Sequence, residues 1–225
     1  MARSPIKRRP LNEQVADRIR GEILSGVIRP GSRLVQGEWA ESLGVSRMPV
    51  RDAFLQLQSE GVLTSGGDGT AVVAATTQEE IHDMYQLASV ASAIAARRAC
   101  MRMSEQDLEE LDAAQTGFIE AVRHEDTDTA FGSNNTFHRL VNIHSESPRL
   151  IALLRNISAG MPALGVREIP EWRGQAIHAH EELLDAFRLR DASRAAEVME
   201  AHVLSAADVV IDHLSKSGLW DEVDV

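Results

Sequence analysis

The sequence of 225 residues contains a single cysteine, Cys100, and this scarcity excludes a fold held together by internal disulfides. No apolar run approaches the roughly 20 residues that a helix needs to cross a bilayer, so we expect no membrane partner. The N-terminal stretch MARSPIKRRP is basic, but no apolar segment follows it, as a secretory signal would require. These absences predict a protein of the reducing cytoplasm.

Basic residues are also in deficit, because the formal net charge is −11 at pH 7. The deficit is uneven: residues 1–75 hold 10 Lys and Arg against 8 Asp and Glu, whereas the remainder holds 13 against 26. Attraction to phosphates acts through a local patch, so an acidic protein with a mildly basic N-terminal region can still bind DNA. Charge alone leaves open that the asymmetry is a matter of chance.

The first 60 residues predict three helices. In the first, apolar residues recur every four positions, at Leu11, Val15, Ile19 and Ile23. The segment RPGSRL then indicates a turn around Pro30-Gly31, and QGEWAESLG predicts a short second helix that buries Trp39 and Leu43.

The segment GVSRMPVRDAFLQLQSEG predicts a third helix with two different faces. Its expected buried stripe consists of Val50, Ala53, Phe54 and Leu57. Ser46 stands where a side chain can cap the helix, and Arg47 and Arg51 lie one turn apart near its start. This pattern is typical of a helix-turn-helix, whose second helix enters the DNA major groove. Helix pairs with surface arginines also occur in proteins that bind no DNA.

The segment VLTSGGDGTAVV places two β-prone runs on either side of a Gly-rich turn, which predicts a hairpin. A hairpin after a helix-turn-helix is a wing. The tip, Gly66 to Gly69, carries little side chain, so its backbone can approach phosphates or the minor groove closely.

The segments ILSGVIRPGSRL and WAESLGVSRMPVRDAFLQLQSEGVL, together with this wing, resemble the winged helix-turn-helix of GntR-family transcriptional regulators. The resemblance implies that double-stranded DNA is contacted by Ser46, Arg47, Met48, Arg51 and Gly69. Arg47 and Arg51 match arginines that contact bases and phosphates in the family. Met48 stands where the family usually has Thr, which removes a hydroxyl and offers apolar contact with a thymine methyl instead.

From Gln78 onward the pattern is helical almost without interruption, with Thr77 and Ser104 as possible helix caps. In the first of these helices we expect Ile81, Met84, Leu87 and Ala91 to share one inward face. The fold class we predict is mainly α: a winged helix-turn-helix over residues 8–75, followed by an all-α bundle of six or seven helices over residues 78–217.

Seven of the eight histidines follow residue 120. His178 and His180 are two apart and cannot share a helix face, and His180 falls on an apolar stripe. Asn134 and His138 are four apart, and with His202 on a later helix they could converge inside the bundle. Imidazole favours Zn, Ni, Cu or Fe, whereas oxygen donors favour Mg, Ca or Mn. Surface or hydrogen-bonded core histidines are the ordinary alternative.

Residues 78–215 resemble the FCD ligand-binding domain of the FadR-like GntR subgroup, through the segments NNTFH, HAHEELLDAF and EAHVLSA. The resemblance implies a divalent metal, with Zn expected and Ni or Mn as alternatives, held by Asn134, His138, His180 and His202. It also implies a small organic acid as effector. Asn134 replaces the usual Asp, so a bound ion would keep more positive charge. Ala88 and Ser92 replace an Arg and a Glu that often grip the effector.

These observations predict a homodimeric regulator, in which two recognition helices bind a pseudo-palindromic operator and a small carboxylate controls the affinity. Repression is the expected sign in this family. One alternative is a regulator that senses the metal ion itself. Another is a metal-dependent hydrolase, which would need a general base beside the metal, and the sequence has no motif such as HExxH.

Overall fold

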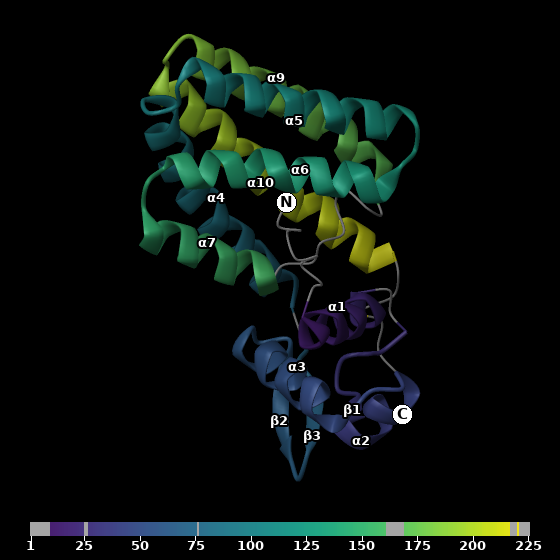
Figure 1. Ribbon diagram of the computed structural model, residues 1–225. Coiled ribbons are helices and arrows are strands. Elements are labelled where there is room, and N and C mark those ends of the chain that lie inside the picture. Colours follow the sequence, from purple (N-terminus) through teal and green to yellow (C-terminus); the bar gives the residue numbers. More distant parts are fainter. Residues whose placement is uncertain (1–9, 25–26, 76, 161–168, 217–219, 221–225) are drawn as a thin grey trace, which may run out of the picture. The chain divides into compact units, whose positions relative to one another are not determined.

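A computed structural model describes residues 10–24, 27–75, 77–160, 169–216 and 220 (Figure 1). The chain divides into two compact units, the first built around the described residues 10–75 and the second formed by Thr77–Lys216. Each unit has a hydrophobic core of its own. Among the helices in the described ranges, none is long and apolar enough to cross a membrane.

The first unit combines three helices with a small sheet. Its elements in chain order are α1 (Leu11–Leu24), β1 (Arg33–Val35), α2 (Gln36–Ser42), α3 (Arg47–Ser59), β2 (Leu63–Gly67) and β3 (Thr70–Val73). The sheet has the order β1-β3-β2, and both pairings are antiparallel. The predicted helices and hairpin are confirmed. Strand β1 was not predicted, because three residues are too few to show a periodicity and β1 depends on its pairing with β3.

The core of the first unit is built on α3, whose predicted stripe Val50, Ala53, Phe54 and Leu57 is buried. Val15 and Ile19 of α1 pack against it, whereas Leu11, the first residue of α1, is 47 % exposed. A spacing of four overshoots the helical turn of 3.6 residues, so the apolar stripe drifts around α1 and its first member leaves the core. Capping by Ser46 was predicted wrongly. Ser46 occupies the N-cap position of α3, but its side chain makes no capping hydrogen bond.

The β2–β3 hairpin ends in a turn that only glycine-rich sequence permits. Gly67, Asp68 and Gly69 have positive φ angles of 75°, 46° and 72°. A Cβ at Gly66 would lie 2.6 Å from Thr70 Oγ1, so no side chain fits there without displacing that hydroxyl. The narrow tip projects beyond the helices of this unit, as a wing does (Figure 1).

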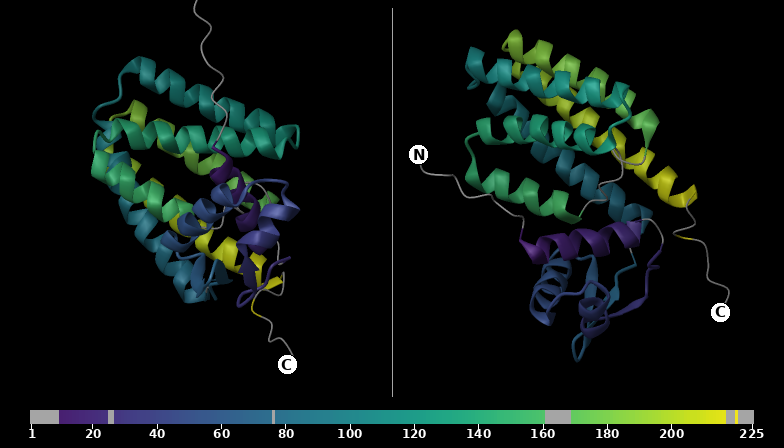
Figure 2. Two further views of the ribbon diagram at one scale, coloured as in Figure 1. Left: turned by 60° about the horizontal axis from the view of Figure 1, so that its bottom comes forward. Right: turned by 45° about the vertical axis from the view of Figure 1, so that its right-hand side comes forward.

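The second unit is entirely helical in its described residues, which confirms the all-α prediction. Its helices are α4 (Gln78–Cys100), α5 (Glu105–Arg123), α6 (Thr127–His144), α7 (Pro148–Gly160), α9 (Pro170–Arg188) and α10 (Ala192–Lys216). The most extensive contacts are those of α4 with α10 and of α5 with α6. Helix α9 packs against both α5 and α10, and α7 packs against α4 (Figures 1 and 2). The main core fills the space between α4, α5, α6, α9 and α10.

The start of α4 agrees with the sequence prediction, since the Thr77 hydroxyl accepts from the Glu80 amide in a capping box. The predicted inward face is partly wrong, because Leu87 is 64 % exposed. Alanines provide much of the buried surface instead: Ala96 and Ala99 enter the main core, and Ala91 and Ala95 pack against Leu154 of α7. The small side chains let this part of α4 pack closely, while Leu87, Val90 and Ile94 lie on the exposed face.

Candidate nucleic-acid interface and metal centre

The N-terminal end of α3 is exposed on the face opposite its buried stripe. Ser46, Arg47, Met48 and Arg51 are all exposed, and Met48 retains 65 % of its accessible surface. The structure therefore brings these four predicted residues together on one surface at the start of a helix. In a helix-turn-helix, these are the positions that contact base edges.

The guanidinium group of Arg47 lies over α2, at a residue that sequence analysis missed. A Cβ built on Gly37 would lie 3.4 Å from Arg47 Nη2, so the bare glycine provides the space that this side chain occupies. Arg51 is held less firmly: its side chain is 63 % exposed, and its Nε lies 3.7 Å from Asp52 Oδ1. An exposed ion pair of this length contributes little, which leaves Arg51 able to turn toward a phosphate or a base.

The wing is attached to the helix-turn-helix through backbone. Gly69, the predicted wing contact, accepts a hydrogen bond of 3.0 Å from the Gln36 amide at the start of α2. Gly69 itself is exposed. This hydrogen bond fixes the position of the wing tip relative to the start of α2, and both belong to the same unit as α3.

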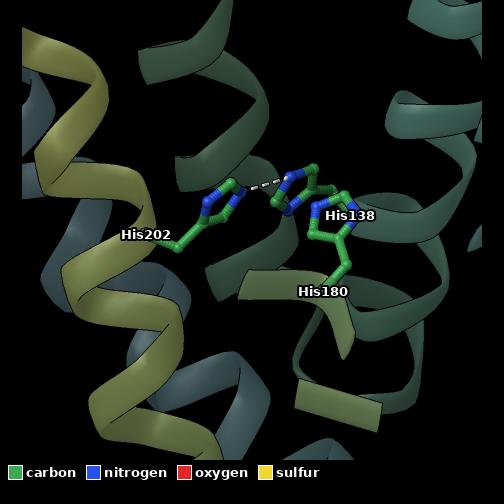
Figure 3. Close-up of side chains that lie close together, drawn as sticks. All are labelled: His138, His180 and His202. Carbon is green, nitrogen blue, oxygen red and sulfur yellow. Dashed lines mark hydrogen bonds between the residues drawn. The ribbon is translucent and has the colours of Figure 1, made fainter. Parts of the chain in front are cut away.

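Three histidines converge inside the second unit, one each from α6, α9 and α10 (Figure 3). The ring nitrogens of His138, His180 and His202 that could bind a metal all lie within 4.8 Å of one another. His138 Nε2 and His202 Nε2 are 3.4 Å apart. That separation exceeds the roughly 2.7–3.2 Å of a normal hydrogen bond. It is close to the roughly 3.3–3.4 Å between two nitrogen ligands of one tetrahedral ion. His178, as expected, points elsewhere and pairs with Glu182 at the surface.

Aromatic side chains fix the orientation of the imidazoles. Phe137 is stacked on His180, with ring centroids 4.0 Å apart and planes 4° from parallel. His202 stacks with two rings: the ring centroid of His138 lies 5.3 Å away, and that of Trp172 on α9 lies 5.6 Å away. The ring planes are therefore set by packing and not by hydrogen bonds alone.

Burial holds all three imidazoles neutral. It lowers the pKa of His138 to about 4 and that of His202 to about 3, with the neighbouring His138 a further cause for His202. The pKa of His180 lies well below its ordinary value, through burial first and then the two other histidines. A neutral imidazole has a free lone pair, so the cluster is in the form that binds a metal.

Several buried polar atoms on α6 and α9 have no hydrogen-bond partner. In the described part of the second unit they are Asn134 Oδ1, Trp172 Nε1 and His180 Nε2. A buried polar atom without a hydrogen bond is costly, so such a cluster needs an explanation. A divalent cation satisfies two of them, since His180 Nε2 and Asn134 Oδ1 are both metal-binding donors. The three histidines therefore fit a metal ion. Asn134, buried on α6 one turn before His138, stays a predicted fourth ligand.

Gln115 of α5 also belongs to this site, and sequence analysis did not identify it. It is only 3 % exposed, and its Oε1 lies 2.9 Å from His180 Nδ1. A lone glutamine between apolar positions gave no signal because its partner lies 65 positions further along the chain. Ala88, which stands in place of an effector-binding arginine, is buried.

Comparisons with known proteins agree with both halves of this description. The model of the bacterial regulatory proteins of the gntR family matches residues 11–72, and the FCD domain model matches residues 73–205. Among solved structures, Escherichia coli McbR/YncC superposes with a TM-score of 0.73 at 22 % identity, covering 92 % of this chain and all of that one. A GntR regulator from Rhodococcus gives a TM-score of 0.66 at 21 % identity, covering 89 % of this chain and 97 % of that one.

Curated relatives match this chain over most of its length. The transcriptional repressor RspR of Escherichia coli K12 is 21 % identical over 216 residues, covering 94 % of this chain and 93 % of its own. The Nta operon transcriptional regulator of Aminobacter aminovorans is 27 % identical over 192 residues, covering 82 % of this chain and 87 % of that protein. The chain thus belongs to the GntR family of bacterial regulatory proteins, as a DNA-binding transcriptional regulator with an FCD domain.

Proposed function

We propose that this protein is a repressor whose affinity for its operator is controlled by a small organic acid, bound at a metal ion in the second unit. The observation that carries this proposal is the convergence of three buried imidazoles. The unpartnered amide oxygen of Asn134, on the same helix as His138, supports it. In this proposal, residues 8–75 form the DNA-binding domain and residues 78–217 form the effector-binding domain.

The metal ligands are His138, His180, His202 and Asn134. Three imidazoles favour zinc, with Ni or Mn as alternatives, and a bound ion would supply Lewis acidity toward an anionic oxygen. All four ligands are neutral, so the site would keep the full charge of a divalent ion and attract an anion. The unpartnered indole N–H of Trp172, stacked on His202, is available to donate to the same anion.

At the DNA interface, Arg47 and Arg51 provide positive charge and contacts with bases. Ser46 precedes Arg47 and Met48 follows it, and both contact the duplex from the start of α3. Each bidentate contact of an arginine with guanine contributes about 1–3 kcal/mol of discrimination. Gly69 lets the wing backbone approach the duplex, since it adds no side chain.

We propose a homodimer formed through α4. Leu87, Val90 and Ile94 are 64 %, 48 % and 48 % exposed and recur along one helix face. Asp83 and Arg97, both exposed, each lie seven residues from Val90. An antiparallel pairing of two α4 helices about Val90 would bury the apolar residues and place each Asp83 opposite Arg97 of the second copy. Such a two-fold arrangement suits a pseudo-palindromic operator.

An effector can act only by binding one arrangement of the two DNA-binding units better than another. By linkage, the operator then changes the affinity for the effector by the same factor, typically about 5–150-fold. Selection of duplexes from a random pool by the zinc-loaded protein would supply an operator. Fluorescence anisotropy would then measure affinity with and without a panel of small mono- and dicarboxylates. We expect at least one acid to weaken binding to wild type but not to a variant with His138→Gln.

The result against the proposal would be an operator affinity that no acid changes in the metal-loaded protein. A second candidate function, direct sensing of the ion, is favoured by the same histidine cluster. It predicts that zinc alone shifts operator affinity, with no further change when an acid is added.

A further inference from the structure

Gln115 joins α5 to α9 through both ends of its side-chain amide. Its Nε2 donates to the Ile177 carbonyl at 3.1 Å, and its Oε1 lies 2.9 Å from His180 Nδ1. Both partners lie on α9, one turn apart. Since Gln115 is almost completely buried, no water competes for these bonds.

The chemistry of the partners fixes the direction of each bond. The Ile177 carbonyl can only accept, so the amide NH₂ of Gln115 must face it. The amide oxygen then faces His180 and can only accept, so His180 Nδ1 must carry the proton. In a neutral imidazole the proton is on one nitrogen only, which leaves His180 Nε2 with a bare lone pair.

The nitrogen that Gln115 leaves unprotonated is the one without a partner in the described structure. Phe137 fixes the plane of the His180 ring, and Gln115 fixes which edge carries the proton. Together they hold a lone pair ready at a buried position, before any ligand arrives.

We propose that Gln115 is a positioning residue of the metal centre, which selects the Nδ1–H tautomer of His180 and so prepares Nε2 to bind the ion. This inference rests on the metal site of the proposed function. It adds that a neutral amide does the work that carboxylates often do behind a metal-binding histidine, and thereby keeps the whole site free of negative charge.

The test compares Gln115→Leu, which removes the acceptor, with Gln115→Glu, which retains an acceptor for Nδ1–H. Gln106→Leu, at an exposed glutamine of the same helix, is the matched control. Imidazole ¹⁵N NMR of the metal-free proteins reports the tautomer of His180. Chelator competition with zinc alone reports the affinity, and thermal melting reports folding.

We expect wild type, Gln115→Glu and the control to show protonated Nδ1. In Gln115→Leu the proton should move in part to Nε2, and zinc affinity should fall by about 10–100-fold. Gln115→Glu should recover most of that loss. An unchanged tautomer or zinc affinity in Gln115→Leu would overturn the proposal, and so would equal losses in both variants.

Failure of the proposed function has a different appearance. If wild type binds no zinc, the metal centre itself is refuted and the positioning role falls with it. The NMR signals separate this case from a failure of Gln115 alone, because they are recorded without metal.

Discussion

The two units of this protein present their predicted functional residues in opposite ways. In the first unit, Arg47, Met48 and Arg51 are exposed on a helix end, and the apolar residues behind them hold that helix in place. In the second unit, His180, His202 and Asn134 are buried in the core itself. A surface suits a partner as large as a duplex, whereas an interior site suits a ligand small enough to be enclosed.

The two sites also differ in their electrostatics, since one is charged and exposed and the other is neutral and buried. Screening by salt acts strongly on the exposed arginines, so operator binding should weaken steeply with ionic strength. The buried histidines are kept neutral by their surroundings. If the two sites act independently, variants in the first unit should leave zinc affinity unchanged. Variants in the second unit should likewise leave operator affinity without effector unchanged.

The largest effect is expected from His202→Gln, which removes one of three imidazoles but approximately keeps the volume. Loss of groups that merely support a ligand costs about 10–100-fold in metal affinity, so loss of a ligand should exceed 100-fold. Zinc affinity by chelator competition gives the measurement, and circular dichroism checks the fold. Operator affinity without effector should match wild type, and a zinc affinity within tenfold of wild type would remove His202 from the ligand set.

Arg51→Ala should weaken operator binding by about 5–150-fold, since it removes a contact of about 1–3 kcal/mol. The slope of affinity against salt concentration should also become shallower. A gel-shift titration over several salt concentrations provides both values, with Arg123→Ala in the second unit as the control. Unchanged affinity would exclude Arg51 from the interface, while altered zinc binding would break the independence of the two units.

The pairing proposed for α4 can be tested by reversing charges. Asp83→Arg alone and Arg97→Asp alone should each weaken dimerisation by about threefold to tenfold, because two symmetry-related exposed pairs become repulsive. The double variant should recover wild-type behaviour in sedimentation equilibrium. If the double variant shows the sum of both losses, the two residues do not face each other across a two-fold axis.

Met48→Thr should have the smallest effect, a change of a few-fold in preference at one base step, since apolar contact with a thymine methyl is a weak discriminator. Parallel selections of duplexes by both proteins would show it. The position of the altered step should be the same in each half-site. Identical selected sequences would mean that Met48 reads no base.

The first unit was largely readable from sequence because its determinants are local. The stripe from Val50 to Leu57, the arginines and the wing glycines lie within 23 residues, so spacing alone related them. Strand β1 and the space at Gly37 were not readable, since both depend on residues distant in the sequence that folding brings near.

In the second unit, the helical period correctly predicted that His180 points inward and that His178 lies on another face. It carries no information about which helices are neighbours. The resemblance to the FCD domain supplied that information for the four predicted ligands. It supplied none for Gln115, whose role depends on the 2.9 Å contact with a histidine of another helix. The predicted burial of Leu87 was wrong because alanines form much of the buried surface of α4.

The missing side chain at Gly37 has a consequence for how operator preference can evolve. Glycine inside a helix costs about 1 kcal/mol relative to alanine, yet here it leaves the arc in which the Arg47 guanidinium rests. A methyl would just touch that group, and a longer side chain would compete with the guanidinium for this space. We therefore expect substitutions at position 37 to change operator preference through Arg47, an effect that mutation of the predicted contact residues alone would overlook.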